Sequence, residues 1–88
     1  MEFEWDAAKR AANLAKHGFD FADVAAFDWP GAIVVADRRA DYGEDRLQAF
    51  AIQDGHLLQV TFTMRRLVVF RIVSYRRANR KERRLYAP

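Results

Sequence analysis

Residues Arg46 to Thr63, RLQAFAIQDGHLLQVTFT, decide the fold that this sequence predicts. The dipeptide Asp54-Gly55 is typical of a two-residue type I′ turn, and apolar residues alternate with polar ones around it. The turn fixes the register of two antiparallel strands, Arg46 to Gln53 and His56 to Thr63.

One face of the predicted hairpin is apolar and the other is polar. The apolar face pairs Leu47 with Phe62, Ala49 with Val60 and Ala51 with Leu58. The polar face pairs Arg46 with Thr63 and Gln48 with Thr61. Because the turn and the alternation agree, we expect the apolar face to lie in the core and the polar face to stay open.

A further strand, Leu67 to Tyr75, follows the hairpin and is apolar on both faces, so the pattern leaves two registers open. In the preferred register, the side chains that join the core are those of Val68, Phe70 and Ile72. The side chains that share the open face with Arg46 are then those of Arg71 and Tyr75. Those that point the other way are Ser74 and Arg76.

The C-terminal segment from Arg71 to Pro88 is strongly basic and ends in a short predicted helix. Seven of the 15 Lys and Arg residues lie there, with Glu82 as the single acid. The helical period places Glu82 on the side facing the body, with Ala78, Leu85 and Tyr86. Glu82 either forms a capping box with Asn79 or pairs with an arginine of the preceding strand, and the two contacts can coexist.

The N-terminal half supplies a short strand, Phe3 to Trp5, and two predicted helices. The first is capped by Asp6 and runs to His17, with Gly18 ending it and Leu14 as its large apolar anchor. The second starts at Asp20, and its buried side consists of Phe21, Val24, Ala25 and Phe27. A short strand, Ala32 to Ala36, follows.

These elements predict an α+β fold in a single domain spanning residues 1–88. We expect an antiparallel sheet of about four strands, two N-terminal helices packed on one face and a short C-terminal helix. The acidic start MEFEWD lacks the apolar core of a signal peptide, and the apolar runs are too short to cross a membrane, so we expect a cytoplasmic protein.

The charge is divided unevenly along the chain. Met1 to Asp45 carries 10 acidic and 5 basic residues, whereas Arg46 to Pro88 carries 2 acidic and 10 basic residues. A basic half attached to a folded body indicates a nucleic-acid partner.

An ordered set of motifs resembles the BrnT family of toxins over nearly the whole chain. The motifs are FEWD at 3–6, Lys9, Asn13, KHG at 16–18, Phe21, DYGEDR at 41–46, T-x-R at 63–65 and R-I-V-S-x-R-x-A-x-x-x-E-R-x-x-Y at 71–86. The resemblance implies a RelE-like ribonuclease that inhibits translation as the toxin of a bacterial type II toxin–antitoxin pair. It also implies a BrnA-like antitoxin with a ribbon-helix-helix domain, a 2:2 complex, and operator DNA bound through the antitoxin.

RNA carries its own nucleophile, the 2′-OH, so a small endoribonuclease requires neither metal nor cofactor. The residues considered for catalysis are His17, Arg71, Arg76, Glu82 and Tyr86. The residues considered for RNA binding are Lys16, Arg46, Arg65, Arg77 and Arg80. The acidic cluster between Asp37 and Asp45 does not have calcium-loop spacing, and two isolated histidines form no zinc site.

Several of these residues have a structural alternative. His17 is also placed to interact with the helix dipole, Tyr86 to join the core, and Arg76 to pair with Glu82. The alternative for the whole chain is a non-catalytic module that binds nucleic acid or only forms the toxin–antitoxin complex. A 2′,3′-cyclic phosphate on the product would distinguish a nuclease from such a module.

Overall fold

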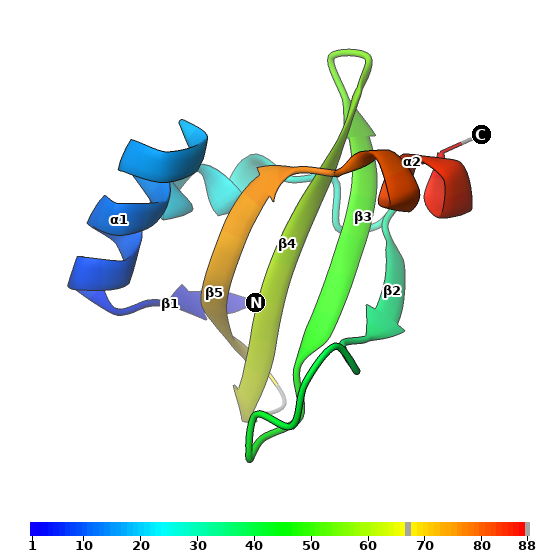
Figure 1. Cartoon of the computed structure of the whole chain (residues 1–88). Helices are drawn as coiled ribbons and strands as arrows, with labels where there is room; N and C mark the ends of the chain where they lie inside the picture. Colours follow the sequence, from blue (N-terminus) through cyan, green and yellow to red (C-terminus); the bar gives the residue numbers. More distant parts are fainter. Residues whose placement is uncertain (67, 88) are drawn as a thin grey trace.

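The computed structural model describes residues 1–66 and 68–87 and contains one mixed sheet of five strands (Figure 1). The strands are β1 (Glu2–Glu4), β2 (Ile33–Ala36), β3 (Leu47–Gln53), β4 (His56–Arg66) and β5 (Val69–Arg77). The helices are α1 (Ala7–His17), the 3-10 helix η1 (Phe21–Ala26) and α2 (Arg80–Tyr86). The α+β class is as predicted, while Leu67, the predicted start of the last strand, lies outside the described residues.

The strand order is β1-β5-β4-β3-β2, which corrects the expectation of about four antiparallel strands. The N-terminal strand joins the sheet as a fifth member and runs parallel to β5, with Phe3 opposite Phe70. A parallel pair needs a long crossover between its strands. Most of the chain lies between β1 and β5, so no local sequence pattern predicts their pairing.

The central hairpin has the predicted register. Leu47 lies opposite Phe62, and Ala49 lies opposite Val60. The turn residues Asp54 and Gly55 have φ values of 51° and 78°, the pair of positive angles that a type I′ turn requires.

The main core lies on the apolar face of this hairpin, under η1. The buried residues of η1 and its end are Phe21, Val24 and Phe27, and they pack against β3, β4 and β5. Their spacing of three residues matches the 3-10 period, in which every third side chain lies on one face. The expected second α-helix is therefore a 3-10 helix, and Ala25, expected to be buried, is exposed.

A bulge in β5 reverses part of its predicted orientation. Phe62 pairs with Ile72 while Thr61 pairs with Ser74, so Val73 is an extra residue in the ladder. Before the bulge, the core position of Ile72 is as predicted. After it, Tyr75 is buried in the core at 3% exposure, which corrects the expectation that it lies on the other face.

The remaining orientations along β5 follow from the same bulge. Ser74 and Arg76 lie across from Thr61 and Gln59, so they share the polar face of the sheet, contrary to the preferred register. Arg71 lies across from Thr63 on that face, as expected. Val68, expected in the core, is 57% exposed.

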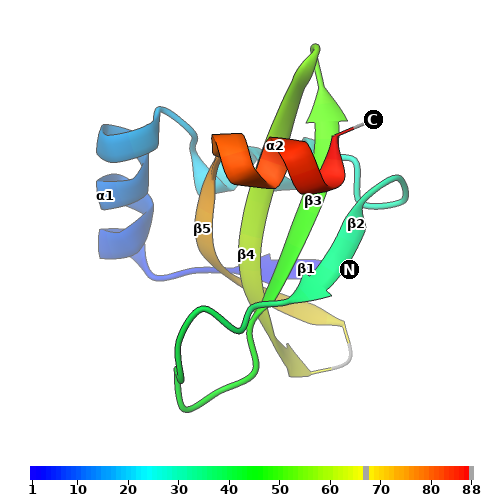
Figure 2. The ribbon, with the colours of Figure 1, turned by 45° about the vertical axis from the view of Figure 1, so that its right-hand side comes forward.

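The polar face is covered rather than open. Gln48, Gln59 and Thr61 are all buried, with exposures of 7%, 0% and 1%. The covering element is α2, which lies over β3 near the end of β5 (Figures 1 and 2). Its Tyr86 stacks on Phe50 with the ring centroids 4.3 Å apart, which places a second, smaller cluster on this face.

Helix α1 lies beside β5 rather than on a face of the sheet (Figures 1 and 2). Asp6 caps it and Gly18 ends it in the left-handed conformation, as predicted. The expected anchor, Leu14, is 44% exposed, and the buried residue of the helix is Asn13. Two N-terminal helices on one face are therefore not observed.

Asn13 attaches α1 to the edge of β5. Its Nδ2 donates to the carbonyl oxygens of Tyr75 at 2.7 Å and Phe19 at 2.9 Å, and its Oδ1 accepts from the Tyr75 N–H at 3.2 Å. This amide completes the β5 edge beyond the residues paired with β1. The described residues contain no helix long and apolar enough to cross a membrane.

Candidate nucleic-acid site

A basic cleft of about 310 Å³ lies between α1 and the bulge of β5. The residues lining it are Lys9, Ala12, Asn13, Lys16, His17, Arg46, Val73 and Ser74. Four of them carry cationic or titratable side chains, and they come from distant parts of the sequence. The fold brings them together because Asn13 holds α1 against β5, so that the last turn of α1 flanks the polar face.

Arg46 reaches the cleft from the start of β3. Its guanidinium carbon lies 4.0 Å from the centre of the Tyr42 ring, a cation–π arrangement, and its Nη2 is 3.5 Å from Glu44. Its Nε is buried without a hydrogen-bond partner among the described residues. Arg46 also lines a second cavity of about 830 Å³ under the loop from Asp37 to Asp45, so it separates the two cavities.

His17 is electrostatically suited to accept a proton. Its pKa is lowered, first by burial and then by the positive charges of Lys16 and Arg76. A histidine acting only as a partner of the helix dipole would be stabilised in its charged form. At neutral pH the His17 imidazole is therefore uncharged and has a free acceptor nitrogen.

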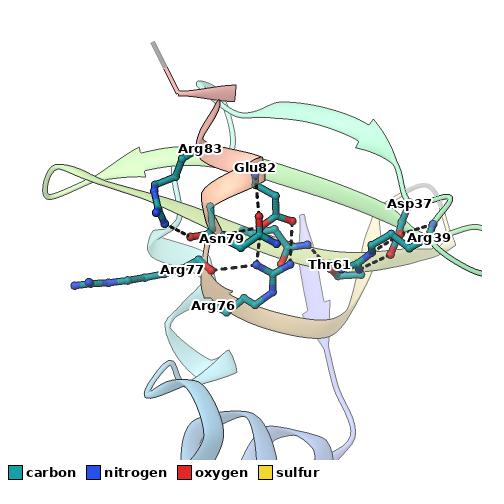
Figure 3. Close-up of polar contacts among 10 residues, drawn as sticks. Asp37, Arg39, Thr61, Arg76, Arg77, Asn79, Glu82 and Arg83 are labelled. Atoms are coloured by element: carbon teal, nitrogen blue, oxygen red, sulfur yellow. Dashed lines mark hydrogen bonds and ion pairs between the residues drawn. The ribbon is translucent and has the colours of Figure 1, made fainter. Parts of the chain in front are cut away.

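Arg76 is held rigidly by Glu82. The two Nη atoms of Arg76 lie 2.7 and 3.0 Å from the Glu82 carboxylate oxygens, and the side chains are 15% and 11% exposed (Figure 3). Glu82 also accepts from the Asn79 N–H at 2.9 Å, while Asn79 accepts from the Glu82 N–H at 2.8 Å. The capping box and the arginine pair thus coexist in one carboxylate.

The protonation state of Glu82 follows from these contacts. Burial raises its pKa, but the hydrogen bonds from Arg76 and from the Asn79 N–H outweigh burial and leave the pKa lowered. Glu82 is therefore ionised at neutral pH and shares both its oxygens with protein donors. Its geometry suits it to position Arg76 rather than to exchange protons with a substrate.

Arg39 is a further cation that the sequence interpretation did not select. Its Nε and Nη2 lie 2.8 and 2.7 Å from the carboxylate of Asp37, whose side chain is fully buried (Figure 3). Hydrogen bonds from Arg39 lower the pKa of Asp37, and the same contact with Asp37 raises the pKa of Arg39, with smaller contributions that include the charge of Glu82. The D-x-R spacing of Asp37 and Arg39 is the sequence signal for this pair.

The other selected residues do not line the cleft. Arg71 and Arg65 both approach Glu4, each with a closest distance of 3.4 Å. Arg77 lies 3.3 Å from the His56 ring, and Arg80 is exposed on α2. Tyr86 is occupied by its stacking on Phe50, which is the structural alternative considered for it.

Carboxylates and histidines do not gather into a metal-like group in the described part of the chain. No set of three or more His, Asp or Glu side chains there is placed to hold a metal ion. Asp37 is paired with Arg39, and Glu44 approaches Arg46.

Comparisons with known proteins identify the family to which the chain belongs. Residues 5–82 match the family model of the ribonuclease toxin BrnT of type II toxin–antitoxin systems. A crystal structure of the Brucella abortus ribonuclease toxin BrnT is 33% identical, with a TM-score of 0.74 over 91% of this chain and 99% of that chain. No curated protein matches. The chain therefore belongs to the BrnT family of ribonuclease toxins of type II toxin–antitoxin systems.

Proposed function

We propose that this chain is a metal-independent endoribonuclease whose site is the cleft between α1 and β5. The observation that carries the proposal is the convergence of Lys16, His17 and Arg46 around this cleft, with Arg76 close enough to lower the pKa of His17. These groups supply what phosphodiester cleavage by the RNA 2′-OH requires: a phosphate clamp, a base and stabilisation of developing negative charge.

In the proposed reaction, Lys16 and Arg46 bind the scissile phosphate. The neutral His17 imidazole accepts the proton of the 2′-OH, and the 2′-oxygen forms a bond to phosphorus. The bond to the leaving 5′-oxygen breaks, and that oxygen takes a proton from solvent. The products are a 2′,3′-cyclic phosphate and a 5′-OH, and Arg76 stabilises the charge that develops on the phosphoryl oxygens.

The remaining selected residues take supporting roles in this proposal. Glu82 positions Arg76 through its bidentate contact. The arginines proposed to bind flanking phosphates are Arg65, Arg71, Arg77 and Arg80. Tyr86 is assigned to packing, because its ring stacks on Phe50.

The cellular role follows from the family. We infer a single-domain, RelE-like toxin that acts in the cytoplasm and inhibits translation by cutting RNA. A BrnA-like antitoxin with a ribbon-helix-helix domain neutralises it in a 2:2 complex, and the antitoxin binds operator DNA. What supports this inference is membership of a type II toxin–antitoxin family, in which the toxin has an antitoxin partner.

The test is to incubate the purified chain with RNA in the presence of a chelator and identify the product ends. We expect 2′,3′-cyclic phosphate ends, and a loss of cleavage of at least about 100-fold for His17→Gln. Lys81→Ala, on the exposed side of α2, is the matched control and should cleave normally. RNA that is bound but uncut would instead indicate the non-catalytic alternative.

A further inference from the structure

The outer edge of β2 is an unprotected sheet edge. β2 is last in the strand order, and no other strand in residues 1–66 or 68–87 pairs with its outer side. Its sequence, IVVA, carries no charge, and Ile33 and Val34 are 47% and 49% exposed. The opposite edge strand, β1, reads EFE and is protected by its acids. Edge strands without such protection are templates for pairing with another chain.

The backbone of β2 shows which groups are available for such pairing. The Asp37 N–H donates to the Arg46 carbonyl at 2.8 Å, next to the pair formed by Ala36 and Leu47. In an antiparallel ladder, hydrogen-bonded pairs alternate with pairs whose peptide groups point outward. The N–H and C=O groups of Val34 and Ala36 therefore point to the free edge.

An apolar groove adjoins this edge on the face covered by α2. Its volume is about 230 Å³. The residues lining it are Asp28, Gly31, Ile33, Phe50, Ala51, Ile52, Leu57 and Tyr86. Ile52 is 47% exposed, so a strand added beside β2 could cover apolar side chains as well as pair its backbone.

The charge of α2 decides which partner suits this surface. Lys81 and Arg84 are exposed on the helix that contributes Tyr86 to the groove, whereas the guanidinium of Arg83 donates to the Ala78 carbonyl at 2.9 Å. Two copies of this chain paired edge to edge would each bring these cations to the shared interface. A partner with acidic side chains gains favourable charge pairing in the same place.

We propose that the edge of β2 and the adjoining groove bind an extended segment of the antitoxin, which adds a strand to the sheet. The segment would alternate apolar side chains, for the groove, with acidic ones, for the cations of α2. This inference rests on the proposed neutralisation by a protein antitoxin. No residue that lines the groove also lines the α1 cleft, and the cleft residue beside β2, Arg46, bonds to Asp37 at the end of the strand opposite Ile33. Binding there is therefore separable from RNA cleavage.

The experiment measures the affinity of the whole chain for the antitoxin encoded beside it, by titration calorimetry. Val34→Pro removes an outward N–H, and Ile52→Glu places a negative charge at the groove. We expect each change to weaken binding by at least about 10-fold. Arg84→Glu should weaken binding most at low salt. Leu14→Glu, an equally exposed apolar position on α1, is the matched control and should bind as the wild type does.

Three outcomes would overturn the proposal. One is wild-type affinity for both Val34→Pro and Ile52→Glu, each checked for a normal melting curve. Another is a dimer of the wild-type chain alone that Ile52→Glu converts to monomers, which assigns the edge to a second copy. The third is loss of RNA cleavage by Ile52→Glu without antitoxin, which assigns the surface to RNA. An inactive wild type would count against the ribonuclease but leave the binding comparison intact.

Discussion

At the scale of single residues, Glu82 joins two structural tasks that are usually separate. One carboxylate completes the cap of α2 and fixes the guanidinium of Arg76. The pair is mostly buried, so each charge depends on the other for compensation. The side chain therefore connects the stability of the C-terminal helix to the position of Arg76, which the proposed reaction uses.

Glu82→Gln separates these tasks. Glutamine preserves a capping box, whereas it leaves the charge of Arg76 without its partner. We expect the free energy of unfolding to fall by about 2–4 kcal/mol, with RNA cleavage falling alongside. Thermal melting with Glu2→Gln, an exposed acid, as control checks this. Wild-type melting would mean that Glu82 acts only as a cap.

The lowered pKa of His17 gives two pH dependences. The ordinary pKa of a histidine is about 6.5, and the folded chain holds the pKa of His17 lower. RNA cleavage should therefore rise with pH until the pH exceeds this lowered pKa, and then level off. At a pH between the folded and the unfolded pKa of His17, the unfolded chain binds more protons than the folded chain does. The free energy of unfolding therefore also rises with pH there. Cleavage and melting measured from about pH 5 to 8 test both, and His17→Gln should flatten the melting profile in that window.

At the scale of elements, the position of α1 depends on the Asn13 amide more than on apolar packing. Asn13→Ala leaves the N–H and C=O of Tyr75 without their partners, so we expect a loss of about 2–4 kcal/mol in the free energy of unfolding. Leu14→Ala, next to it on the exposed side, should cost less than about 1 kcal/mol. Urea unfolding compares the two, and the reverse order would show that α1 is held by Leu14.

The hairpin turn provides a second test at this scale. Gly55 has a φ of 78°, and a Cβ added there would meet no atom within 4 Å. Gly55→Ala should therefore lower the free energy of unfolding only by the cost of holding alanine in the left-handed conformation, about 1–2 kcal/mol. Denaturation of this variant should show that loss, while the register, followed by NMR contacts between Ala49 and Val60, should stay the same.

The elements also show why some of the fold could be predicted and some could not. The hairpin was predictable because Asp54-Gly55 and the alternation around it give the same register. The bulge at Val73 has no local signal, and it reversed the side of Tyr75 and Arg76. Gln48 and Gln59 are buried because α2 packs over them, which is a tertiary contact. The alternation of polar and apolar residues does not contain this contact, so it predicted an open face where the structure has a buried one.

At the scale of the whole molecule, the cleft is formed by residues far apart in the sequence. The interpretation selected Lys16, His17 and Arg46 by chemical type, and the fold brings all three to one cleft. It also selected Arg71 for catalysis, although Glu4 approaches the Arg71 guanidinium at 3.4 Å. The contact of Glu4 with Arg71 depends on the β1–β5 pairing, which the sequence did not predict. The burial of Asp37 beside Arg39 depends on the loop conformation, which the sequence did not predict either.

The whole-molecule prediction concerns growth. Expression of the chain alone should arrest bacterial growth, and co-expression of the neighbouring antitoxin should relieve the arrest. Arg46→Ala should grow normally at equal soluble expression, because it removes the phosphate clamp. Normal growth with verified wild-type protein would favour a chain kept only for complex formation.

Helix α1 has one buried side chain, that of Asn13, and this has a consequence for hydrogen exchange. Its other side chains are half-buried or exposed, whereas β4 is buried along most of its length. Helix α1 can therefore detach by local opening while the sheet remains folded. We expect its amides to exchange by such opening much faster than those of β4. Because His17 and Lys16 leave with the helix, each opening also disassembles the cleft, and bound RNA should slow the exchange of α1 selectively.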